Sequence, residues 1–477
     1  MRLAEIMKGI DCRLGFDCEV SDVTNDSREV KAGSVFVCIQ GVRMDGHDFA
    51  ASALEKGAAA VVCERDLGLA KQALVADSHK AFGKMAANFY GNPAERLRLV
   101  GVTGTKGKTT VTTLVKAILT RSGQKVGLIG TNQHETGGEI VPSSNSTPGP
   151  MTLQGLYAAM RGNGYGFCVM EVSSHALDQQ RIGDSFYETA VFTNLAHEHL
   201  DYHKDMEDYF AAKAKLFSIC SSAVVNLDDE YGRRLLGMIK VPVMTFSLER
   251  EADLMAKEIV CHADSVDFVL CAGGVESRVH FAMPGRFSVK NALAAAGACL
   301  QLGVGIDTIV SALSEVKGIC GRIEIIPTHR DFTVITDYAH TPDSLENVLS
   351  SLKETVSGRL VALFGCGGDR DRSKRPLMAA AAARYADRLI VTSDNPRTED
   401  PQAIIDEILP GLEGTEVPYD VVVNRREAIY FALRQAKPGD TIVLAGKGNE
   451  DYQIIGHEKF PFDERIIVAE ALKEIYG

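Results

Sequence analysis

A glycine-rich loop between a predicted strand and a predicted helix constrains the fold of this chain more than any other feature. The segment from Leu97 reads LRLVGVTGTKGKTTVTTLVKAILTRSG, where apolar Leu114, Ile118 and Leu119 recur at helical spacing and Gly123 stands where a helix-ending glycine belongs. The loop glycines allow backbone N–H groups to wrap a phosphate, and the following helix presents its positive end to the same anion. A strand–loop–helix unit of this kind is typical of an α/β domain built on a parallel sheet.

The residues inside this loop indicate a nucleoside triphosphate as the anion. Lys108 is placed to reach the terminal phosphates, and Thr109 or Thr110 can offer a hydroxyl to Mg²⁺. The strict patterns GxxxxGKS and GxxxxGKT require glycine where Val102 stands, so this loop is a variant, and an ordinary glycine-rich turn is the alternative interpretation. The predicted phosphate-binding residues are Gly104, Thr105, Lys106, Gly107, Lys108, Thr109 and Thr110.

Predicted strands and helices alternate along the whole chain, whose 477 residues suffice for about three domains. A Gly-Asn-Pro cluster ending at Pro93 closes the first stretch, and a third series of strands begins near Gly321. We therefore expect an α/β protein with domains over residues 1–95, 96–320 and 321–477. The predicted strands are Ser34–Ile39, Ala58–Cys63, Lys125–Ile129, Phe167–Met170, Thr189–Thr193, Thr333–Thr336, Arg359–Phe364, Arg388–Thr392 and Thr441–Ala445, with a predicted helix over Ala51–Lys56.

Composition and charge exclude several classes of protein. The 51 basic and 63 acidic residues give a net charge of −12, which argues against duplex nucleic acid or an anionic membrane as the main partner. The 11 cysteines form no CxxC pair and are expected to be reduced thiols. The first residues, MRLAEIMKGIDCRLG, lack the apolar core of a signal peptide, and no run approaches the ~18 apolar residues of a membrane span. The sequence predicts a soluble cytoplasmic protein.

A predicted buried strand ends in a carboxylate at Glu171, followed by VSSH. An enzyme with a phosphate loop needs an acid there to hold Mg²⁺, although Glu171 alone could be a solvated strand-end residue. The later segment HEHLDYH, from His197 to His203, lacks the HExxH spacing and has no cysteine nearby, so zinc is not expected. One imidazole could join Glu171 and an oxygen ligand around a second divalent cation, and the other two histidines are expected at the surface.

Two loops that follow predicted strands carry arginines able to form paired hydrogen bonds with a carboxylate. They are GCGGDRDR, which begins at Gly365 and contains Arg370, and the tetrapeptide Asp394-Asn-Pro-Arg397. Ligands bind beyond the carboxyl ends of the strands in open parallel sheets, which favours a binding role. Taken singly, an arginine on such a loop is usually solvated.

Together these segments resemble the Mur ligases, the ATP-dependent enzymes that add amino acids during peptidoglycan assembly. The resemblance covers nearly the whole chain, and it implies a three-domain α/β fold with an N-terminal substrate domain, a central P-loop ATPase domain and a C-terminal Rossmann-like domain. The matching segments are Asp26–Arg28, Asp45–His47, Gly104–Thr110, Glu171–His175, Asn194–Leu195, His199–Asp201, Asp337–Pro342, Gly365–Arg370, Asp394–Arg397 and Gly446–Glu450. Glu198, Ser288 and Asn449 stand where family members commonly carry other polar residues, which affects the details of metal and amino-acid contacts.

The resemblance also implies roles for individual residues, with Lys108, Lys213 and His340 as catalytic candidates. Besides the loop, the nucleotide is expected near Asn291, Arg322, Asp337 and His340. The UDP-muramoyl dipeptide is expected to contact Ser27, Asn145, Ser146, Thr147, Ser173, Gln179 and Arg181. Lys213 matches the family lysine that is carbamylated, and it would help Thr109, Glu171 and His199 to hold Mg²⁺. The amino acid is expected at Arg370, Asp394, Asn395, Pro396, Arg397, Gly446 and Glu450.

The implied reaction is the addition of meso-2,6-diaminopimelate to UDP-N-acetylmuramoyl-L-alanyl-D-glutamate, with ATP, through an acyl phosphate. The Asp394–Arg397 pattern goes with diaminopimelate, whose second carboxylate Arg397 and Arg370 can take. We expect a monomer with no nucleic-acid or membrane partner. The alternatives are a lysine-adding ligase of the same family, a folylpolyglutamate synthetase, and a nucleotide-binding ATPase or regulator that does not ligate.

Overall fold

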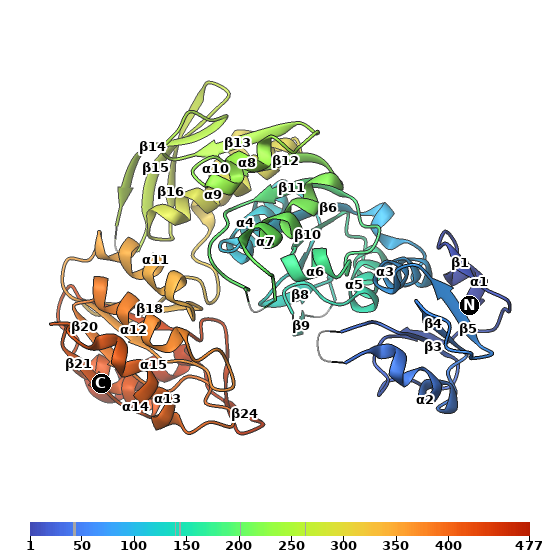
Figure 1. Cartoon of the computed structure of the whole chain (residues 1–477). Coiled ribbons are helices and arrows are strands. Elements are labelled where there is room, and N and C mark those ends of the chain that lie inside the picture. Colours follow the sequence, from blue (N-terminus) through green and yellow to red (C-terminus); the bar gives the residue numbers. More distant parts are fainter. Residues whose placement is uncertain (42–43, 139, 143–144, 201, 263) are drawn as a thin grey trace. The chain divides into compact units, whose positions relative to one another are not determined.

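The computed structural model describes residues 1–41, 44–138, 140–142, 145–200, 202–262 and 264–477, so Asp201 of the HEHLDYH segment lies outside the described residues. The chain, whose elements are labelled in Figure 1, forms two compact units. The first contains Met1–Met244 with Ala298–Gly303, and the second contains Thr245–Gly297 with Val304–Gly477. No helix within the described ranges has both the length and the apolar character needed to cross a membrane.

The first unit begins with a five-stranded sheet in the order β1-β5-β4-β3-β2, which is parallel apart from β1. Its elements are α1 (Leu3–Ile6), β1 (Cys12–Arg13), β2 (Asp22–Thr24), β3 (Ser34–Val37), α2 (Ala50–Glu55), β4 (Ala60–Cys63), β5 (Gln72–Val75) and α3 (Ser78–Phe89). Successive residues of β3 point to opposite faces, so Val35 and Val37 pack with Phe82 of α3 while Phe36 packs with Ala53 of α2. The sheet is therefore covered on both faces, as its continuous apolar strands require.

The second sheet of this unit has the order β12-β11-β6-β10-β7-β8-β9, parallel from β12 to β7. Its elements are β6 (Arg98–Thr103), α4 (Lys108–Arg121), β7 (Val126–Ile129), β8 (Gln133–Glu135), β9 (Ile140–Pro142), α5 (Pro150–Gly162), β10 (Phe167–Glu171), α6 (Ser174–Asp178), β11 (Tyr187–Phe192), α7 (Met206–Ala214), β12 (Cys220–Asn226) and α8 (Glu230–Leu236). The central strand β6 lies between β10 and β11, with Val102 opposite Glu171 and Thr103 opposite Phe192. The glycine-rich loop, Glu171 and the segment after β11 therefore emerge at one edge of the sheet.

Helix α3 of the first sheet packs directly on α5 of the second. A Cβ placed on Gly83 would lie 2.7 Å from the Cα of Gly183, so the two backbones meet more closely than any side chain allows. The side-chain amide of Gln180 donates to Asp77 over 2.8 Å beside this contact. The two sheets of the first unit are thus joined through packed backbone and a polar contact.

The second unit opens with strands in the order β16-β15-β14-β13, in which β14, β15 and β16 form an antiparallel meander. These elements are β13 (Val243–Ser247), β14 (Leu254–Cys261), β15 (Val266–Ala272) and β16 (Val275–Phe281), followed by α9 (Arg286–Gln301) and α10 (Ile306–Glu315). The division between the units falls within β13, after Met244, and within α9, before Ala298. Helix α10 packs against β16.

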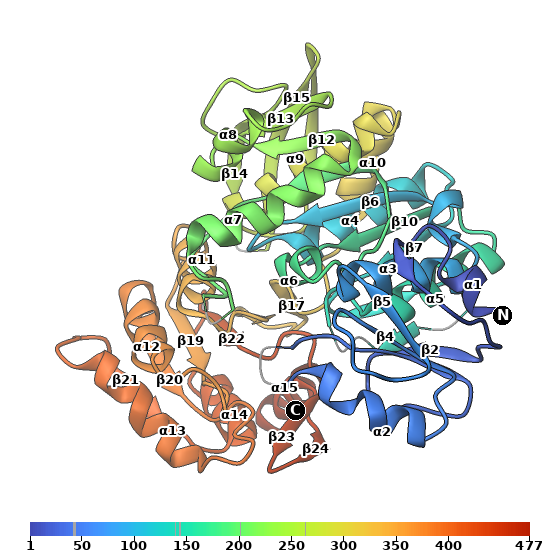
Figure 2. The ribbon, with the colours of Figure 1, turned by 45° about the vertical axis from the view of Figure 1, so that its right-hand side comes forward.

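The rest of the second unit is a six-stranded sheet in the order β17-β18-β22-β19-β20-β21, parallel except for β17, with a separate hairpin β23-β24. The elements are β17 (Glu324–Ile326), β18 (Thr333–Asp337), α11 (Pro342–Lys353), β19 (Leu360–Phe364), α12 (Lys374–Tyr385), β20 (Arg388–Val391), α13 (Pro401–Ile408), β21 (Tyr419–Val421), α14 (Arg425–Arg434), β22 (Thr441–Ala445), β23 (Tyr452–Ile455), β24 (Glu458–Pro461) and α15 (Glu464–Tyr476). Alternate strand residues enter separate cores. Helices α11, α12 and α13 contribute to one core and α14 and α15 to the other; these helices are labelled in Figure 2.

The α/β class and the predicted strands are confirmed, each strand within two residues of its predicted ends. The largest differences are two residues, at the start of β4 (Ala60), the start of β11 (Tyr187) and the end of β3 (Val37). A buried ion pair then sets the end of β22: Arg425 donates to Glu464 over 2.8 Å and to the carbonyl of Ala445 over 2.9 Å. Glu464 also accepts a hydrogen bond from Thr336 over 2.7 Å. This network holds the end of β22, and Gly446 is the next residue in the chain.

Candidate functional site

The glycine-rich loop is held in a shape that only glycine permits at Gly104. Its φ is +146°, and a Cβ there would lie 1.9 Å from the Thr193 hydroxyl. The residues that follow β11 form hydrogen bonds with the loop. The Thr105 N–H donates to the Asn194 carbonyl over 2.9 Å, and the Thr193 hydroxyl donates to the Lys106 carbonyl over 2.6 Å. The strand–loop–helix unit is therefore built as the sequence predicts, with α4 beginning at Lys108.

Two lysines converge on the carbonyls of this loop. Lys108 donates to the carbonyls of Gly104 and Thr105, each over 2.9 Å, so its side chain bends back onto the loop. Lys213, from α7, donates to the same Gly104 carbonyl over 2.8 Å. The structure thus brings both catalytic candidates of the first unit to one carbonyl oxygen.

Glu171 is buried at the end of β10, and three donors surround its carboxylate. Its Oε1 accepts from the Thr109 hydroxyl over 2.9 Å and from the Thr131 N–H over 2.8 Å, and its Oε2 accepts from the Thr131 hydroxyl over 3.0 Å. The sequence left Thr109 and Thr110 as alternatives, and the hydroxyl that meets Glu171 is that of Thr109. The loop hydroxyl and the strand-end carboxylate are therefore adjacent.

Lys213 lies in a setting that disfavours its ammonium form. Its side chain is 1% exposed and stands 4.6 Å from the centre of the Tyr209 ring. Burial holds the pKa of Lys213 well below its usual value, the positive charge of Lys108 lowers this pKa further, and Glu198 acts in the opposite direction. A buried lysine of this kind reaches the neutral amine more readily than a surface lysine.

The histidines of this region gather with Tyr209. The ring of His199 lies 5.9 Å from that of Tyr209 and 5.0 Å from that of His175. His197 is exposed as expected, but the expectation of a surface position for His203 was wrong. His203 is buried because its two ring nitrogens contact the Ser174 hydroxyl at 3.0 Å and Asp208 at 3.1 Å.

Of the residues expected to hold Mg²⁺, Thr109 and Glu171 fit such a group in both chemistry and placement. The described residues contain no cluster of three or more His, Cys, Asp or Glu side chains able to hold a metal ion. A divalent cation at Glu171 would therefore need further oxygen ligands, and the Thr109 hydroxyl is already within hydrogen-bonding distance of that carboxylate. A charged lysine cannot contribute such a ligand, whereas the carbamate of Lys213 could.

Five of the seven residues expected at the UDP-muramoyl dipeptide form one hydrogen-bonded series beside Glu171. The Thr147 hydroxyl donates to the Glu171 carbonyl over 2.9 Å and accepts from the Ser173 N–H over 3.0 Å. Arg181 donates to the Thr147 carbonyl over 3.2 Å, and burial lowers the pKa of its guanidinium. The series is completed by Gln179, which accepts from Arg181 over 2.6 and 2.9 Å, and by Ser146, whose hydroxyl is 2.7 Å from that of Thr131.

Ser27 and Asn145 are the other two residues of that set. Ser27 lies in the turn after β2, where its carbonyl accepts from Lys56 over 2.8 Å, and its neighbours Asp26 and Arg28 form an ion pair. Asn145 is exposed. Both remain predictions.

The nucleotide residues expected beyond the loop belong to the second unit. Asn291 lies on α9, and Asp337, at the end of β18, accepts from the Ile323 N–H over 2.8 Å. The guanidinium of Arg322 stands 5.1 Å from the centre of the Tyr338 ring, and the His340 ring contacts the Tyr338 carbonyl at 2.8 Å. Burial, with the charge of Glu450 as the next cause, raises the pKa of Tyr338 to about 12.

The predicted amino-acid residues meet where β20 and β22 end. The Asn395 amide donates to Glu450 over 2.9 Å, and a Cβ on Gly446 would lie 3.2 Å from Asp394 Oδ2, with a φ of +119° at that glycine. Burial raises the pKa of Glu450, Lys447 lowers it, and Asp394 raises it. These four predicted residues therefore form one polar cluster.

Arg397 and Arg370 flank the neighbouring Gly367. A Cβ on Gly367 would lie 2.9 Å from Arg397 Nη1 and 3.7 Å from Arg370 Cγ, and Arg397 donates to the Gly368 carbonyl over 2.9 Å. The carbonyl of Pro396 approaches so closely that a Cβ on Gly368 would lie 1.9 Å from it. The two loops thus bring Arg397 and Arg370 together beside Gly367.

Arg397 also joins the hairpin β23-β24. Its N–H donates to the Ile454 carbonyl over 3.1 Å, and its carbonyl accepts from the Gly456 N–H over 2.7 Å, with a φ of +52° at Arg397. Burial raises the pKa of Tyr452 in β23; Glu450 raises it further and Arg397 lowers it. Arg397 and Glu450 therefore both act electrostatically on one phenol.

Two well-placed residues escaped the sequence reasoning. Thr131 donates to both oxygens of Glu171, and its signal in the sequence was its position just after the predicted strand Lys125–Ile129. Lys447 is fully buried within the Gly446–Glu450 segment that resembles the family, but no role was assigned to it. In both cases the side chain acts on a neighbouring polar residue.

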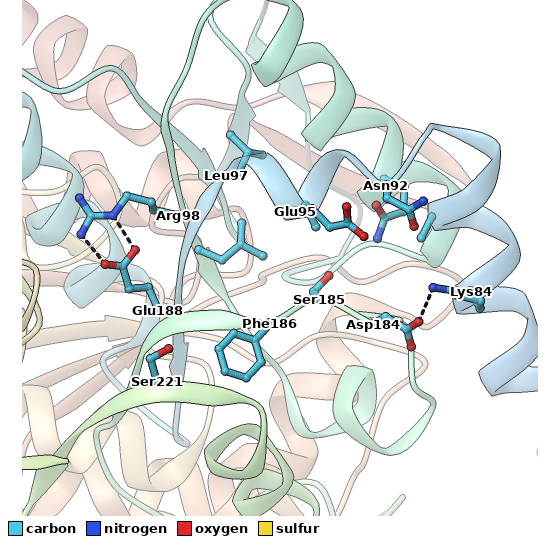
Figure 3. A pocket seen from close by; sticks show the side chains of 14 residues that line it. Lys84, Asn92, Glu95, Leu97, Arg98, Asp184, Ser185, Phe186, Glu188 and Ser221 are labelled. Atoms are coloured by element: carbon cyan, nitrogen blue, oxygen red, sulfur yellow. Dashed lines mark hydrogen bonds and ion pairs between the residues drawn. The ribbon is translucent and has the colours of Figure 1, made fainter. Parts of the chain in front are cut away.

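A pocket of about 390 Å³ lies at the start of the central strand β6, whereas the phosphate loop follows the end of that strand (Figure 3). Arg98 at the start of β6 pairs there with Glu188, and Lys84 pairs with Asp184 over 2.8 Å. None of its lining residues belongs to the predicted site. The pocket is therefore distinct from the phosphate loop and from the dipeptide residues.

Models of protein families match three parts of the chain. They are described as "Mur ligase family, catalytic domain" over residues 19–90, "Mur ligase middle domain" over residues 102–299 and "Mur ligase, glutamate ligase domain" over residues 321–448. Together they account for most of the chain.

Curated relatives match the chain over nearly its full length. A protein of Syntrophomonas wolfei subsp. wolfei is 43% identical over 99% of each chain, and one of Bacillus velezensis is 44% identical over 96% of this chain and 95% of its own. Both are named UDP-N-acetylmuramoyl-L-alanyl-D-glutamate--2,6-diaminopimelate ligase. A solved structure with the same name superimposes with a TM-score of 0.70 at 33% identity, covering 96% of each chain.

Proposed function

The chain belongs to the Mur ligase family, and we propose that it adds meso-2,6-diaminopimelate to UDP-N-acetylmuramoyl-L-alanyl-D-glutamate, using ATP, in the synthesis of peptidoglycan precursors. The observation that carries this proposal is the full-length similarity to ligases of that name, at 43% identity over 99% of each chain. The three-domain α/β fold of the family accommodates both halves of the reaction. The first unit carries the phosphate loop, and the second carries the amino-acid cluster.

The first chemical step activates a carboxylate that is a poor electrophile. Transfer of the γ-phosphoryl group of ATP to the γ-carboxylate of the D-glutamyl residue gives an acyl phosphate and ADP. Two anions must approach each other, and the ammonium of Lys108 at the start of α4 offsets their repulsion. The amine of diaminopimelate then attacks the acyl carbon, phosphate leaves, and an amide forms. We propose His340 as a candidate for handling the proton released from that amine.

We propose that Mg²⁺ is held beside the phosphate loop by Thr109, Glu171, His199 and the carbamate of Lys213. A bound Mg²⁺ would neutralise charge on the transferring phosphoryl group. Carbamylation joins the neutral amine of Lys213 to CO₂ and releases a proton. The low pKa of Lys213 supports this assignment because only the neutral amine reacts.

We further propose that the loop Gly104–Thr110, with Asn291, Arg322 and Asp337, binds the nucleotide. The series Ser146, Thr147, Ser173, Gln179 and Arg181 would bind the UDP-muramoyl dipeptide, together with Asn145 and, at the uridine, Ser27. Its continuity with Glu171 through Thr147 supports this role, since the reacting carboxylate must come close to the phosphoryl group.

Three broader expectations belong to the same proposal. The domains would run over residues 1–95, 96–320 and 321–477, and the three family models, over residues 19–90, 102–299 and 321–448, support this division. We propose a monomer acting in the cytoplasm, where ATP is available. All 11 cysteines are free thiols, which suits a reducing compartment.

We propose that the amino-acid site selects diaminopimelate through its second amino-carboxylate end. Arg397, with Arg370, would take the far carboxylate through paired charge-assisted hydrogen bonds, and Glu450 would take the far ammonium. Asp394, Asn395, Pro396 and Gly446 would shape the walls around them. Lysine lacks the far carboxylate and would leave the guanidinium without its partner.

The test supplies purified enzyme, ATP, Mg²⁺ and UDP-muramoyl-L-Ala-D-Glu with either diaminopimelate or lysine, and measures product and phosphate. Efficient diaminopimelate ligation with little lysine product is expected. The reverse preference would establish the lysine-adding alternative. Phosphate release with ATP alone and no ligated product would establish an ATPase or regulator instead.

A further inference from the structure

The ammonium of Lys447 is enclosed by the amino-acid cluster. Its side chain is 0% exposed, and its Nζ donates to Asn395 Oδ1 over 3.0 Å and to the Tyr452 carbonyl over 2.8 Å. Two carboxylate oxygens, from Asp394 and Glu450, each lie 3.4 Å from it. An ammonium has three N–H donors, so the protein itself takes up all of them. Lys447 must therefore act through its neighbours.

Lys447 and the backbone N–H of Ile454 together determine which way the Asn395 amide faces. Asn395 Oδ1 accepts from Lys447 and also from the Ile454 N–H over 2.9 Å, and neither donor could face the amide nitrogen instead. The Asn395 nitrogen is therefore directed at Glu450 Oε2, to which it donates over 2.9 Å. The Lys447 ammonium thus helps to orient the Asn395 amide, which in turn donates to the Glu450 carboxylate.

Lys447 also sets the charge around Glu450. Within the part of the chain that the structure describes, the polar contacts of the Glu450 carboxylate fall on Oε2, from Asn395 and from Lys447. Oε1 is therefore the oxygen available to a bound molecule. Lys447 is the cation that compensates two acidic side chains, Glu450 and Asp394, in a buried place.

We propose that Lys447 is a positioning residue that orients Asn395 and keeps Glu450 charged, so that Glu450 Oε1 receives the far ammonium of an amino acid with two amino-carboxylate ends. This inference rests on the proposed amino-acid site. It adds a residue that touches no substrate and yet decides how tightly the far end of the substrate is held.

The decisive variant is Lys447→Met, which keeps the length of the side chain and removes its charge. The KM for diaminopimelate should rise about 10- to 100-fold, as expected when a charged group loses its hydrogen-bond partner. The KM values for ATP and for the UDP-muramoyl dipeptide should stay as in the wild type. The matched control is Lys459→Met, because Lys459 is an exposed lysine 4.0 Å from the Tyr452 ring and should leave all three values unchanged.

The pH dependence of KM separates positioning from a merely structural role. Lys447 lowers the pKa of Glu450 while Asp394 and burial raise it, so this pKa rises further in Lys447→Met. Tyr338 and Tyr452 also face Glu450, and both have raised pKa values, so they stay neutral. Raising the pH should therefore partly restore the KM for diaminopimelate in Lys447→Met, and it should not do so in Glu450→Gln.

Three results would overturn the inference: a wild-type KM for diaminopimelate in Lys447→Met, an equal rise in KM for all three substrates, or a KM that does not respond to pH. If Lys447→Met does not fold, the double variant Lys447→Met with Asp394→Asn removes one buried carboxylate together with the ammonium, and its comparison with Asp394→Asn alone carries the same test. Arg397→Ala separates this inference from the proposed function. Unchanged selectivity in Arg397→Ala would place the amino-acid site elsewhere, whereas a defective Arg397→Ala beside a normal Lys447→Met would reject the role of Lys447 alone.

Discussion

Replacing Lys213 by methionine should abolish ligation while leaving the fold intact. The side chain of Lys213 is 1% exposed, and its contacts are the Gly104 carbonyl at 2.8 Å and the Tyr209 ring at 4.6 Å. Desolvation of such a charge costs several kcal/mol. Against this stand about 1.5–3 kcal/mol for a hydrogen bond to a charged group and about 0.5–2 kcal/mol for the contact with the ring. Cost and gain nearly cancel, so the free energy of unfolding at pH 7 should change by no more than about 2 kcal/mol.

The pH dependence of stability gives the sharper part of this prediction. The pKa of Lys213 in the folded chain lies below its ordinary value of 10.5, so unfolding takes up a proton at pH values between the two. The free energy of unfolding therefore gains about 1.4 kcal/mol per pH unit as the pH rises through that window. Lys213→Met should lack this contribution, because methionine does not titrate.

The assay compares urea midpoints of the wild type and Lys213→Met across pH in buffers freed of CO₂, which keep the lysine uncarbamylated. Lys215→Met is the matched control, because Lys215 is an exposed lysine near the end of the same helix. Ligation is then measured with bicarbonate present, and acetate or formate should restore part of the activity of Lys213→Ala by supplying oxygen ligands. Parallel pH profiles for the wild type and Lys213→Met, or normal turnover in a Lys213 variant, would refute the reasoning.

Three further predictions concern the other parts of the site. Lys108→Ala should reduce ligation at least 100-fold with an unchanged circular dichroism spectrum, since a cation that stabilises transferring charge is lost; normal turnover would remove Lys108 from the site. Ser27→Ala should raise the KM for the UDP-muramoyl dipeptide more than the KM for ATP, and equal KM values in variant and wild type would place the nucleotide sugar elsewhere. Arg397→Ala should lower the ratio of kcat/KM for diaminopimelate over lysine by about 100-fold or more, as expected for two lost hydrogen bonds to a carboxylate; a preserved ratio would contradict the proposed pocket.

Local sequence was sufficient for the elements and for the phosphate loop. Apolar runs predicted strands such as β10 and β22 because a strand buried on both faces has no polar positions to interrupt it. The loop was recognisable because its backbone conformation requires glycine: Gly104 has a φ of +146° and no room for a Cβ. Because such constraints act within a few residues, they produce local patterns from which the structure can be predicted.

The clustering of site residues depended on strand order, which a single sequence does not reveal. Glu171 meets Thr109 because β10 pairs with β6, although 62 positions separate the two residues in the chain. The burial of His203 was missed for the same reason, since Ser174, its partner at 3.0 Å, lies on a different segment of the chain.

The sequence by itself determined the α/β class, the phosphate loop and the segments that resemble the Mur ligases, because each of these follows from short-range patterns of apolar, glycine and charged residues. Only the tertiary structure decided which side chains act through others. Thr131 forms a hydrogen bond with Glu171, and Lys447 forms hydrogen bonds with Asn395 and Glu450. These contacts depend on how separate strands and loops pack. A lysine in a glycine-rich segment looks alike in sequence whether solvent or two buried carboxylates surround it. Its burial, and with it its role, exists only in the folded chain.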